Sequence, residues 1–335
     1  MNIPSNLMLD NRDEFLKKIE ATSEPAQIIG NDAENQVVIA RCKEHPLAYV
    51  CLYGSNYVSV VDIIEARRLL DITVDEGPFD ICIDKKHMLA YVSNFFSNTL
   101  SVIDLYINKT INTTPVGKLP VGVAVLPGGC FVYVVNYGEP SVYVLEARTL
   151  KKVTEITLPS IGFTIDITAN GTLAFVSLRD AQQIAAIDLT LNKVIKIVPA
   201  GPGTEVVKLS PTNRHAFVSN EDGNSITPVN VALVEAAAPY TGQSGPVGIA
   251  FTDGGNTVYC ANRFAQSVTS FDVFSHQPLS TIPAGQGPYG LAAASGGKLL
   301  VVSNSYENTI SILDTRLNKL LQSVVVGIPA FLTIL

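Results

Sequence analysis

The residues of this sequence that could bind a ligand or do chemistry recur at a spacing of 42 positions. Aromatic side chains beside arginine are typical of binding hot spots. Carboxylates beside arginine or lysine can instead hold the shifted pKa values that acid/base catalysis uses. Two adjacent columns mix these types: Tyr53, Phe95, Tyr137, Arg179, Glu221, Arg263 and Ser305, and Gly54, Phe96, Gly138, Asp180, Asp222, Phe264 and Tyr306.

A third column, at the start of other apolar runs, adds Phe79, Phe163, Glu205 and Tyr289. From the three columns we predict a ligand-binding set that consists of Tyr53, Phe95, Phe96, Tyr137, Arg179, Glu205, Glu221, Arg263, Phe264, Tyr289 and Tyr306. The alternative is that the aromatic residues only pack between structural units. Catalytic residues stay unassigned, although Glu205, Glu221, Asp180 or Asp166 beside a basic residue would be the groups of an acid/base site.

One further column carries an isolated pair of opposite charges. Its members are Ala40, Cys82, Ala124, Asp166, Lys208, Ala250 and Ala292. Because Asp166 and Lys208 occupy neighbouring units, we predict an ion pair between them. The pair is either a structural bridge or a polar anchor for a ligand.

Familiar catalytic and cofactor motifs are absent from the sequence. It has no HExxH, GxSxG, Walker A or Rossmann glycine pattern. His45, His87, His215 and His276 fall in turns on the side away from the predicted binding set. His45 and His87 share a column, but we expect no acidic or thiol ligand beside them, and we therefore predict no metal and no cofactor.

The elements that must position these side chains follow from the repeat itself. Asp62, Asp104, Glu146, Asp188, Asn230, Asp272 and Asp314 are each 42 residues apart, which gives seven copies without an insertion. Within one copy, PVGVAVLPGG, FVYVVN, SVYVLE and KKVTEITLP are four β-prone runs separated by turn residues. The sequence therefore predicts an all-β, seven-bladed β-propeller with four-stranded antiparallel blades. The loops after the second and fourth strands share one face, here called the upper face, which carries the predicted binding set.

The amino-acid sequence of the repeat also resembles that of a known family. The segments AYVSN and SNTLSVID (residues 90 to 104), FVSN (217 to 220) and VVSN and ENTISILD (301 to 314) are similar to the YVTN-type β-propeller repeat. The resemblance covers residues 36 to 330 and departs from the pattern at Leu52 and Leu178, where the strand-end Asn is missing. It implies the propeller fold, and such propellers include binding proteins as well as distant enzyme relatives. The histidine or metal constellations of propeller lactonases and lyases have no counterpart in this sequence.

The ends of the chain leave the closure of the ring open. We predict an N-terminal extension with a short helix over residues 1–25 and a single propeller domain over residues 26–335. Residues 27–42 and 320–335 both have the register of a fourth strand followed by a first strand. We expect the N-terminal copy to lie inside the first blade. The last residues would then pack elsewhere. The alternative is that Phe331–Leu335 competes for the inner position, and an unpaired β segment could also pair with a second chain and support a homodimer.

Composition limits the partners and the compartment. The 335 residues are 47% hydrophobic and 16% charged, which excludes disorder, and the net charge of −7 argues against nucleic acid and membrane partners. No signal-like segment or membrane-length apolar run is present, and five cysteines without a CxxC pair suggest a reducing compartment, so we expect a soluble cytoplasmic protein. The predicted function is a non-enzymatic scaffold that presents its upper face to a protein or small molecule. The alternative is a lactonase- or lyase-like propeller enzyme.

Overall fold

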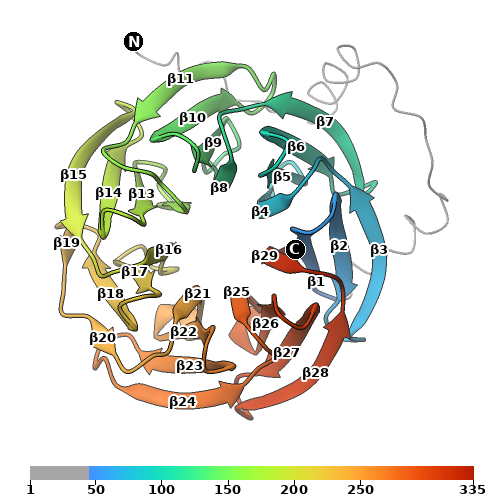
Figure 1. Cartoon of the computed structure of the whole chain (residues 1–335), viewed down its shortest axis with the longest axis vertical. Helices are drawn as coiled ribbons and strands as arrows, with labels where there is room; N and C mark the ends of the chain where they lie inside the picture. Colours follow the sequence, from blue (N-terminus) through green and yellow to red (C-terminus); the bar gives the residue numbers. More distant parts are fainter. Residues whose placement is uncertain (1–44) are drawn as a thin grey trace.

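A computed structural model describes residues 45–335 as a closed ring of seven antiparallel sheets arranged around a common axis (Figure 1). A cavity lined by the innermost strands lies at the centre of the ring and is here called the central channel. The predicted seven-bladed β-propeller is confirmed. The predicted N-terminal extension, its helix and Ala40 lie outside the described residues. Within residues 45–335, no helix has the length and apolar character needed to cross a membrane.

The first four blades, each given from the innermost strand outward, have the following bounds. Blade 1 is β29 (Pro329–Ile334), β1 (Leu47–Leu52), β2 (Tyr57–Asp62) and β3 (Arg67–Thr73). Blade 2 is β4 (Pro78–Asp84), β5 (Leu89–Asn94), β6 (Thr99–Asp104) and β7 (Lys109–Pro115). Blade 3 is β8 (Pro120–Val125), β9 (Phe131–Asn136), β10 (Ser141–Glu146) and β11 (Lys152–Thr157). Blade 4 is β12 (Ile165–Ile167), β13 (Leu173–Leu178), β14 (Gln183–Asp188) and β15 (Lys193–Pro199).

The remaining three blades follow the same order, with one interrupted outer strand. Blade 5 is β16 (Thr204–Leu209), β17 (His215–Asn220) and β18 (Ser225–Asn230), and its outer edge is split into β19 (Glu235–Ala236) and β20 (Tyr240–Thr241). Blade 6 is β21 (Pro246–Thr252), β22 (Thr257–Asn262), β23 (Ser267–Asp272) and β24 (Pro278–Pro283). Blade 7 is β25 (Pro288–Ala294), β26 (Leu299–Asn304), β27 (Thr309–Asp314) and β28 (Lys319–Val325). Short 3-10 turns η1 (Asp253–Gly255) and η2 (Ser295–Gly297) follow β21 and β25.

The repeated acidic column closes the turn after the third strand of a blade. Asp104 Oδ1, for example, accepts hydrogen bonds from the backbone N–H groups of Tyr106 and Ile107. Equivalent bonds are made by Asp62, Asp188, Asp272 and Asp314. This column therefore serves the scaffold, because a short carboxylate can satisfy turn N–H groups that no strand partner reaches.

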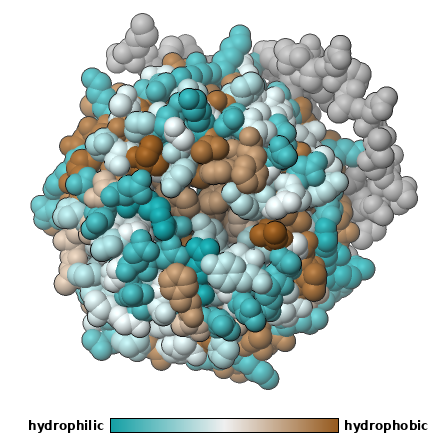
Figure 2. Space-filling view, in the orientation of Figure 1, coloured by the Kyte–Doolittle hydropathy of each residue, from teal (hydrophilic) through white to brown (hydrophobic). Residues whose placement is uncertain are grey.

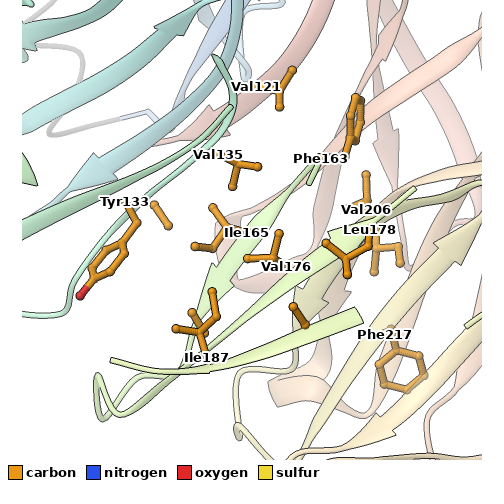
Figure 3. Packing of buried hydrophobic residues seen from close by; sticks show 14 of the residues in the cluster. Val121, Tyr133, Val135, Phe163, Ile165, Val176, Leu178, Ile187, Val206 and Phe217 are labelled. Carbon is orange, nitrogen blue, oxygen red and sulfur yellow. The ribbon is translucent and has the colours of Figure 1, made fainter. Parts of the chain in front are cut away.

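The core lies between neighbouring blades, where the faces of adjacent sheets pack together. Figure 3 shows Val121 and Val135 of blade 3 beside Ile165 and Val176 of blade 4. One repeated column places a large, fully buried ring in blades 1 to 5, namely Tyr49, Tyr91, Tyr133, Phe175 and Phe217. Each blade thus buries both of its faces only when it has a neighbour on each side, and this requirement favours a closed ring.

The ring is closed by the C-terminal strand, and our prediction that the N-terminal copy lies inside the first blade was wrong. β29 pairs with β1 in antiparallel register, with Ala48 opposite Ile334 and Val50 opposite Leu332 (Figure 1). Phe331 and Leu332 are buried in this position. The C-terminal residues therefore take the inner position that we left as the alternative, as a core strand of blade 1.

We predict that Phe331→Ala lowers the free energy of unfolding by about 3 kcal/mol, because it removes a large buried ring from the closing strand. Thr333→Ala changes a half-buried residue of the same strand and should lower the free energy of unfolding by less than about 1 kcal/mol. Urea unfolding of the two variants measures both effects. Equal effects of the two substitutions would contradict the placement of β29 inside blade 1.

Candidate functional site

The upper face is formed as the repeat predicts, with the loops after second and fourth strands lying side by side. The backbone N–H of Phe95 donates to Gly77 O at 2.8 Å, and that of Arg263 donates to Gly245 O at 2.8 Å. These bonds join the loop after the second strand of one blade to the link that enters the same blade. Figure 2 shows hydrophilic and hydrophobic residues interspersed over the face in view, without one broad apolar area.

Four charged residues of the predicted set meet at the channel mouth on blades 4, 5 and 6. Arg179 Nη2 lies 2.8 Å from Glu221 Oε2, and Arg263 Nη1 lies 2.8 Å from Glu221 Oε1. Arg179 also pairs with Glu205 at the start of β16. Glu221 therefore bridges two guanidinium groups that project from its two neighbouring blades.

The carboxylates of this cluster are much more buried than its arginines. The side chains of Glu205 and Glu221 are 3% and 5% exposed, whereas both arginines are 24% exposed. The carboxylates thus form a buried floor, and the guanidinium groups lie between them and solvent. A buried carboxylate needs such partners, because an unpaired charge in this position would cost several kcal/mol.

Two tyrosines complete the charged cluster. Tyr289 OH donates a hydrogen bond to Glu205 Oε1 at 3.0 Å, and burial raises the pKa of this phenol, which keeps the donor protonated. The Arg263 guanidinium lies 5.2 Å from the ring centre of Tyr289 and 5.2 Å from that of Tyr306, within the range of cation–π attraction. Blades 4 to 7 therefore share one polar network at the mouth.

Four aromatic members of the predicted set, Tyr53, Phe95, Phe96 and Tyr137, gather around blades 1 to 3. The Tyr53 ring centre lies 5.7 Å from Phe79, 5.8 Å from Phe95 and 5.0 Å from Phe96. Tyr137 reaches the same group through Phe163 at 6.0 Å. Most of these rings pack on one another, so at Phe95 and Tyr137 the geometry matches the packing alternative.

Three predicted aromatic residues instead remain open to solvent. Phe96 is 51% exposed, and Phe264 and Tyr306 are each 59% exposed. Each ring lies against a glycine with positive φ in the preceding link, namely Gly77, Gly245 and Gly287. A side chain at any of these glycines would meet the ring at 2.4 to 2.5 Å, so these three glycines are needed to seat the exposed rings.

Phe331 is a mouth residue that sequence reasoning missed. Its ring lies 5.5 Å from Phe79 and 5.1 Å from Tyr289, and it therefore joins the aromatic group to the polar cluster. Phe331 follows Tyr289 by 42 positions and so belongs to the column of Phe79, Phe163 and Glu205. The signal was present, but placing the N-terminal copy inside blade 1 removed Phe331 from the ring.

The central channel holds a second group of charges. Its cavity of about 480 Å³ is lined largely by aliphatic side chains of the innermost strands. Lys208 Nζ lies 3.4 Å from Asp166 Oδ2, so the ion pair expected between these two residues is present. Asp166 Oδ2 also accepts a hydrogen bond from Leu209 N–H at 2.9 Å, which joins blades 4 and 5.

Asp80 is a further channel carboxylate that sequence reasoning did not single out. It accepts hydrogen bonds from the N–H groups of Ile81 and Val123, and the second of these reaches the next blade. Burial raises the pKa of Asp80 to about 6, although the two backbone bonds and Lys208 oppose the shift. Asp80 is the one charged residue of its column, whose other members are Gly122, Thr164, Val206, Gly248, Gly290 and Leu332. The criterion that singled out Asp166, a charge in a column of mostly uncharged residues, therefore also applies to Asp80.

The histidines lie on the lower face, with acidic partners that we did not expect. His45 Nδ1 is 2.8 Å from Asp62 Oδ2, and His87 Nδ1 is 2.6 Å from Asp84 Oδ2. The expectation that no acidic ligand lies beside them was wrong, because the turn carboxylates also serve these rings. In residues 45–335, one set of three potential metal ligands clusters, His45, Asp62 and Glu65, but the other oxygen of Asp62 already accepts two turn N–H bonds.

The pKa of Asp80 predicts how stability depends on pH. The native pKa of about 6 exceeds the reference value of 3.8, so the native state binds more protons between these values. The contribution of Asp80 is therefore fully present below pH about 4 and is lost as pH rises through about 6. The difference in unfolding free energy between Asp80→Asn and wild type should therefore be about 1–3 kcal/mol more favourable to the variant at pH about 7.5 than at pH about 4.

Urea unfolding of the wild type and Asp80→Asn at both pH values measures this difference. Asp180→Asn, which changes an exposed carboxylate, is the matched control and should show no such gain. A pH-independent effect of Asp80→Asn would show that the Asp80 carboxyl has an ordinary pKa in the folded protein.

The comparisons with known proteins address the fold. No curated protein matches the sequence. Hydrazine synthase of Kuenenia stuttgartiensis has a similar structure, with a TM-score of 0.71, 18% identity and coverage of 78% of this chain and 90% of that chain. A functionally unknown protein of Desulfotomaculum acetoxidans has a TM-score of 0.76, 17% identity and coverage of 86% and 98%. A provisionally assigned 6-phosphogluconolactonase of Bacteroides uniformis has a TM-score of 0.75, 17% identity and coverage of 87% and 100%.

At these identities the solved structures show the fold alone. A family model described as YNCE-like beta-propeller matches residues 160–298, which span blade 4 to the start of blade 7. The match agrees with the resemblance that the strand-end motifs indicated. The chain is therefore a seven-bladed β-propeller, and the part from blade 4 to the start of blade 7 is similar to the YNCE-like beta-propeller family.

Proposed function

We propose that this chain is a binding propeller that holds a protein or small-molecule ligand on its upper face, across the mouth of the channel. The observation that carries the proposal is the bridge from Arg179 through Glu221 to Arg263. It holds two partly exposed guanidinium groups in fixed positions before any ligand arrives. Such preorganisation lowers the entropy cost of binding, because the arginine side chains are already ordered.

The surroundings of the arginines support a binding role. Phe264 follows Arg263 in the chain, and Tyr306 lies beside Arg263 on the next blade; both rings are exposed. Arginine and tyrosine are enriched among hot-spot residues. A suitable ligand places hydrogen-bond acceptors over the guanidinium groups and an apolar part over these rings. Scaffold positions repeat from blade to blade, whereas these positions differ in size and charge, as expected for a surface selected for recognition.

The engagement of the carboxylates argues against acid/base catalysis. Glu221 has one oxygen on each arginine, and Glu205 contacts Arg179 and accepts the Tyr289 hydroxyl. A general base needs an oxygen within reach of the substrate proton. Each glutamate is already engaged by at least one arginine, so a substrate proton would have to compete with that contact.

The second candidate function is a lactonase- or lyase-like activity that uses the carboxylates and arginines at the mouth. It is favoured by the similarity to two provisionally assigned 6-phosphogluconolactonases from Bacteroides, with TM-scores of 0.75. At 17% and 16% identity these neighbours bear on the fold and leave the chemistry open. The two functions separate in an assay, since only the enzyme turns its ligand over.

The binding proposal is tested with Phe264→Ala/Tyr306→Ala, which removes two exposed rings and leaves the buried carboxylates paired. The wild type and the variant are used to capture ligands from a lysate of the source organism, and the recovered compound or protein is titrated by calorimetry. We expect the double variant to bind at least about tenfold more weakly, as the loss of hot-spot aromatic residues does elsewhere.

Leu233→Ala/Leu317→Ala is the matched control, because it removes two exposed apolar side chains from turns of the opposite face. The control should bind as the wild type does. Equal loss in both double variants would place the ligand elsewhere. Hydrolysis of 6-phosphogluconolactone above the spontaneous rate, abolished by Glu221→Gln, would replace the binding proposal with the enzyme.

A further inference from the structure

A pocket of about 450 Å³ opens on the upper face between blades 1 and 2, and it shares no residue with the arginine–glutamate cluster. Two aromatic rings, Tyr53 and Phe96, contribute to its walls. Two acidic residues, Asp75 and Glu76, come from the link between β3 and β4. The pocket thus combines π faces with carboxylates in one concave site.

The other blades serve as internal controls for the acidic pair. The positions of Asp75 and Glu76 recur as Gly117 and Lys118, Pro159 and Ser160, Gly201 and Pro202, Gln243 and Ser244, Gly285 and Gln286, and Gly327 and Ile328. The links that enter the other six blades therefore carry no acid at either position. Closing the link does not require Asp75 or Glu76, so their placement beside two rings calls for another reason.

The negative charge of the pocket is not neutralised by its own walls. The described residues that line it include no lysine, arginine or histidine. Asp75 Oδ2 accepts a hydrogen bond from Thr99 Oγ1 at 2.9 Å, which orients the carboxylate without cancelling its charge. Glu76 is exposed, and its backbone carbonyl accepts the N–H of Phe96, so the acid and the ring are held next to each other.

The rings are fixed in a geometry that leaves one of them available. Tyr53 and Phe96 have their centres 5.0 Å apart at an interplanar angle of 41°, and Phe96 is 51% exposed. Phe96 also rests on Gly77, where any Cβ would lie 2.4 Å from the ring. Because Tyr53 is braced in turn by Phe79 and Phe95, the wall cannot easily collapse into the pocket.

We propose that this pocket binds the ammonium or guanidinium group of an organic cation. Aromatic faces attract such cations through their quadrupoles, and the nearby carboxylates add charge-assisted contacts. A hard metal ion would use the side-chain oxygens of Ser55, Asn56, Asp75 and Glu76 and would leave the two rings of the wall without a role, whereas an organic cation uses both the rings and the carboxylates. The inference is independent of the mouth cluster and goes beyond the proposed function by assigning a ligand chemistry to a separate site.

The test is an NMR titration of the full chain with tetramethylammonium chloride, with sodium chloride at equal ionic strength as the reference. We expect saturable shifts of the amides of residues 53–56, 75–77 and 96. A second arm uses Nα-acetyl-arginine amide and Nα-acetyl-lysine amide. Tighter binding of these compounds assigns the cation to a peptide side chain, and tighter binding of tetramethylammonium assigns it to a small quaternary amine.

Asp75→Gly/Glu76→Lys is the central variant, because it installs the residues that the next blade carries at the same positions. It should weaken tetramethylammonium binding at least about tenfold while the melting temperature stays within about 3 °C of wild type. Phe96→Leu keeps an apolar side chain but removes the π face, and it should weaken binding about threefold to tenfold. Phe264→Ala/Tyr306→Ala, at the separate mouth cluster, should leave this titration unchanged.

Three results would overturn the inference. Uncharged tert-butanol that binds as tightly as tetramethylammonium would make the site merely apolar. Calcium that saturates the same amides more tightly than any organic cation would make it a metal site. The absence of saturable shifts with every cation would show that the acidic pair has no ligand there. None of these outcomes bears on binding at the mouth, which has its own variants.

Discussion

The pairing of β29 with β1 is the contact on which the rest of this molecule depends. Each blade has two apolar faces and buries both only between two neighbours, so a ring with one open junction would leave two faces in water. The last strand of the chain completes the first blade and thereby joins blade 7 to blade 1. It also places Phe331 at the channel mouth, where the ring of Phe331 contacts Phe79 and Tyr289. The same side chain therefore stabilises the closed ring and shapes the upper face.

A second constraint is electrostatic and acts on the upper face. Glu205 and Glu221 are almost completely buried, and their charge is tolerated because Arg179, Arg263 and Tyr289 supply donors from the surrounding blades. The same contacts order the donors toward solvent. Carboxylates also join neighbouring blades in the channel, where Asp80 and Asp166 each accept a hydrogen bond from a backbone N–H of the next blade. Polar side chains thus tie together blades that apolar packing has already brought into contact.

Because the chain repeats, equivalent positions of its seven blades can be compared with one another. A position that must close a turn keeps its residue type, as the acidic column after the third strand does. Glycine stands under the exposed rings of Phe96, Phe264 and Tyr306, whereas Leu119 and Ile161 occupy that position in two other links. Where one blade carries a residue type that the other blades lack at the same position, the fold of the blade does not require that residue type. Asp80, Asp166 and the pair Asp75 and Glu76 all break their columns, and all line cavities.

The sequence by itself determined the number of blades, the strands of each blade and the face on which Arg179, Glu221 and Arg263 appear. These features follow from local alternation and an unbroken spacing of 42, which any copy of the repeat expresses without knowledge of the others. Only the tertiary structure decided which end closes the ring, because residues 27–42 and 320–335 have the same register and the choice depends on packing against β1. It also decided that Phe95 packs while Phe96 stays open, and that one glutamate serves two arginines, since such contacts join blades that are distant in sequence.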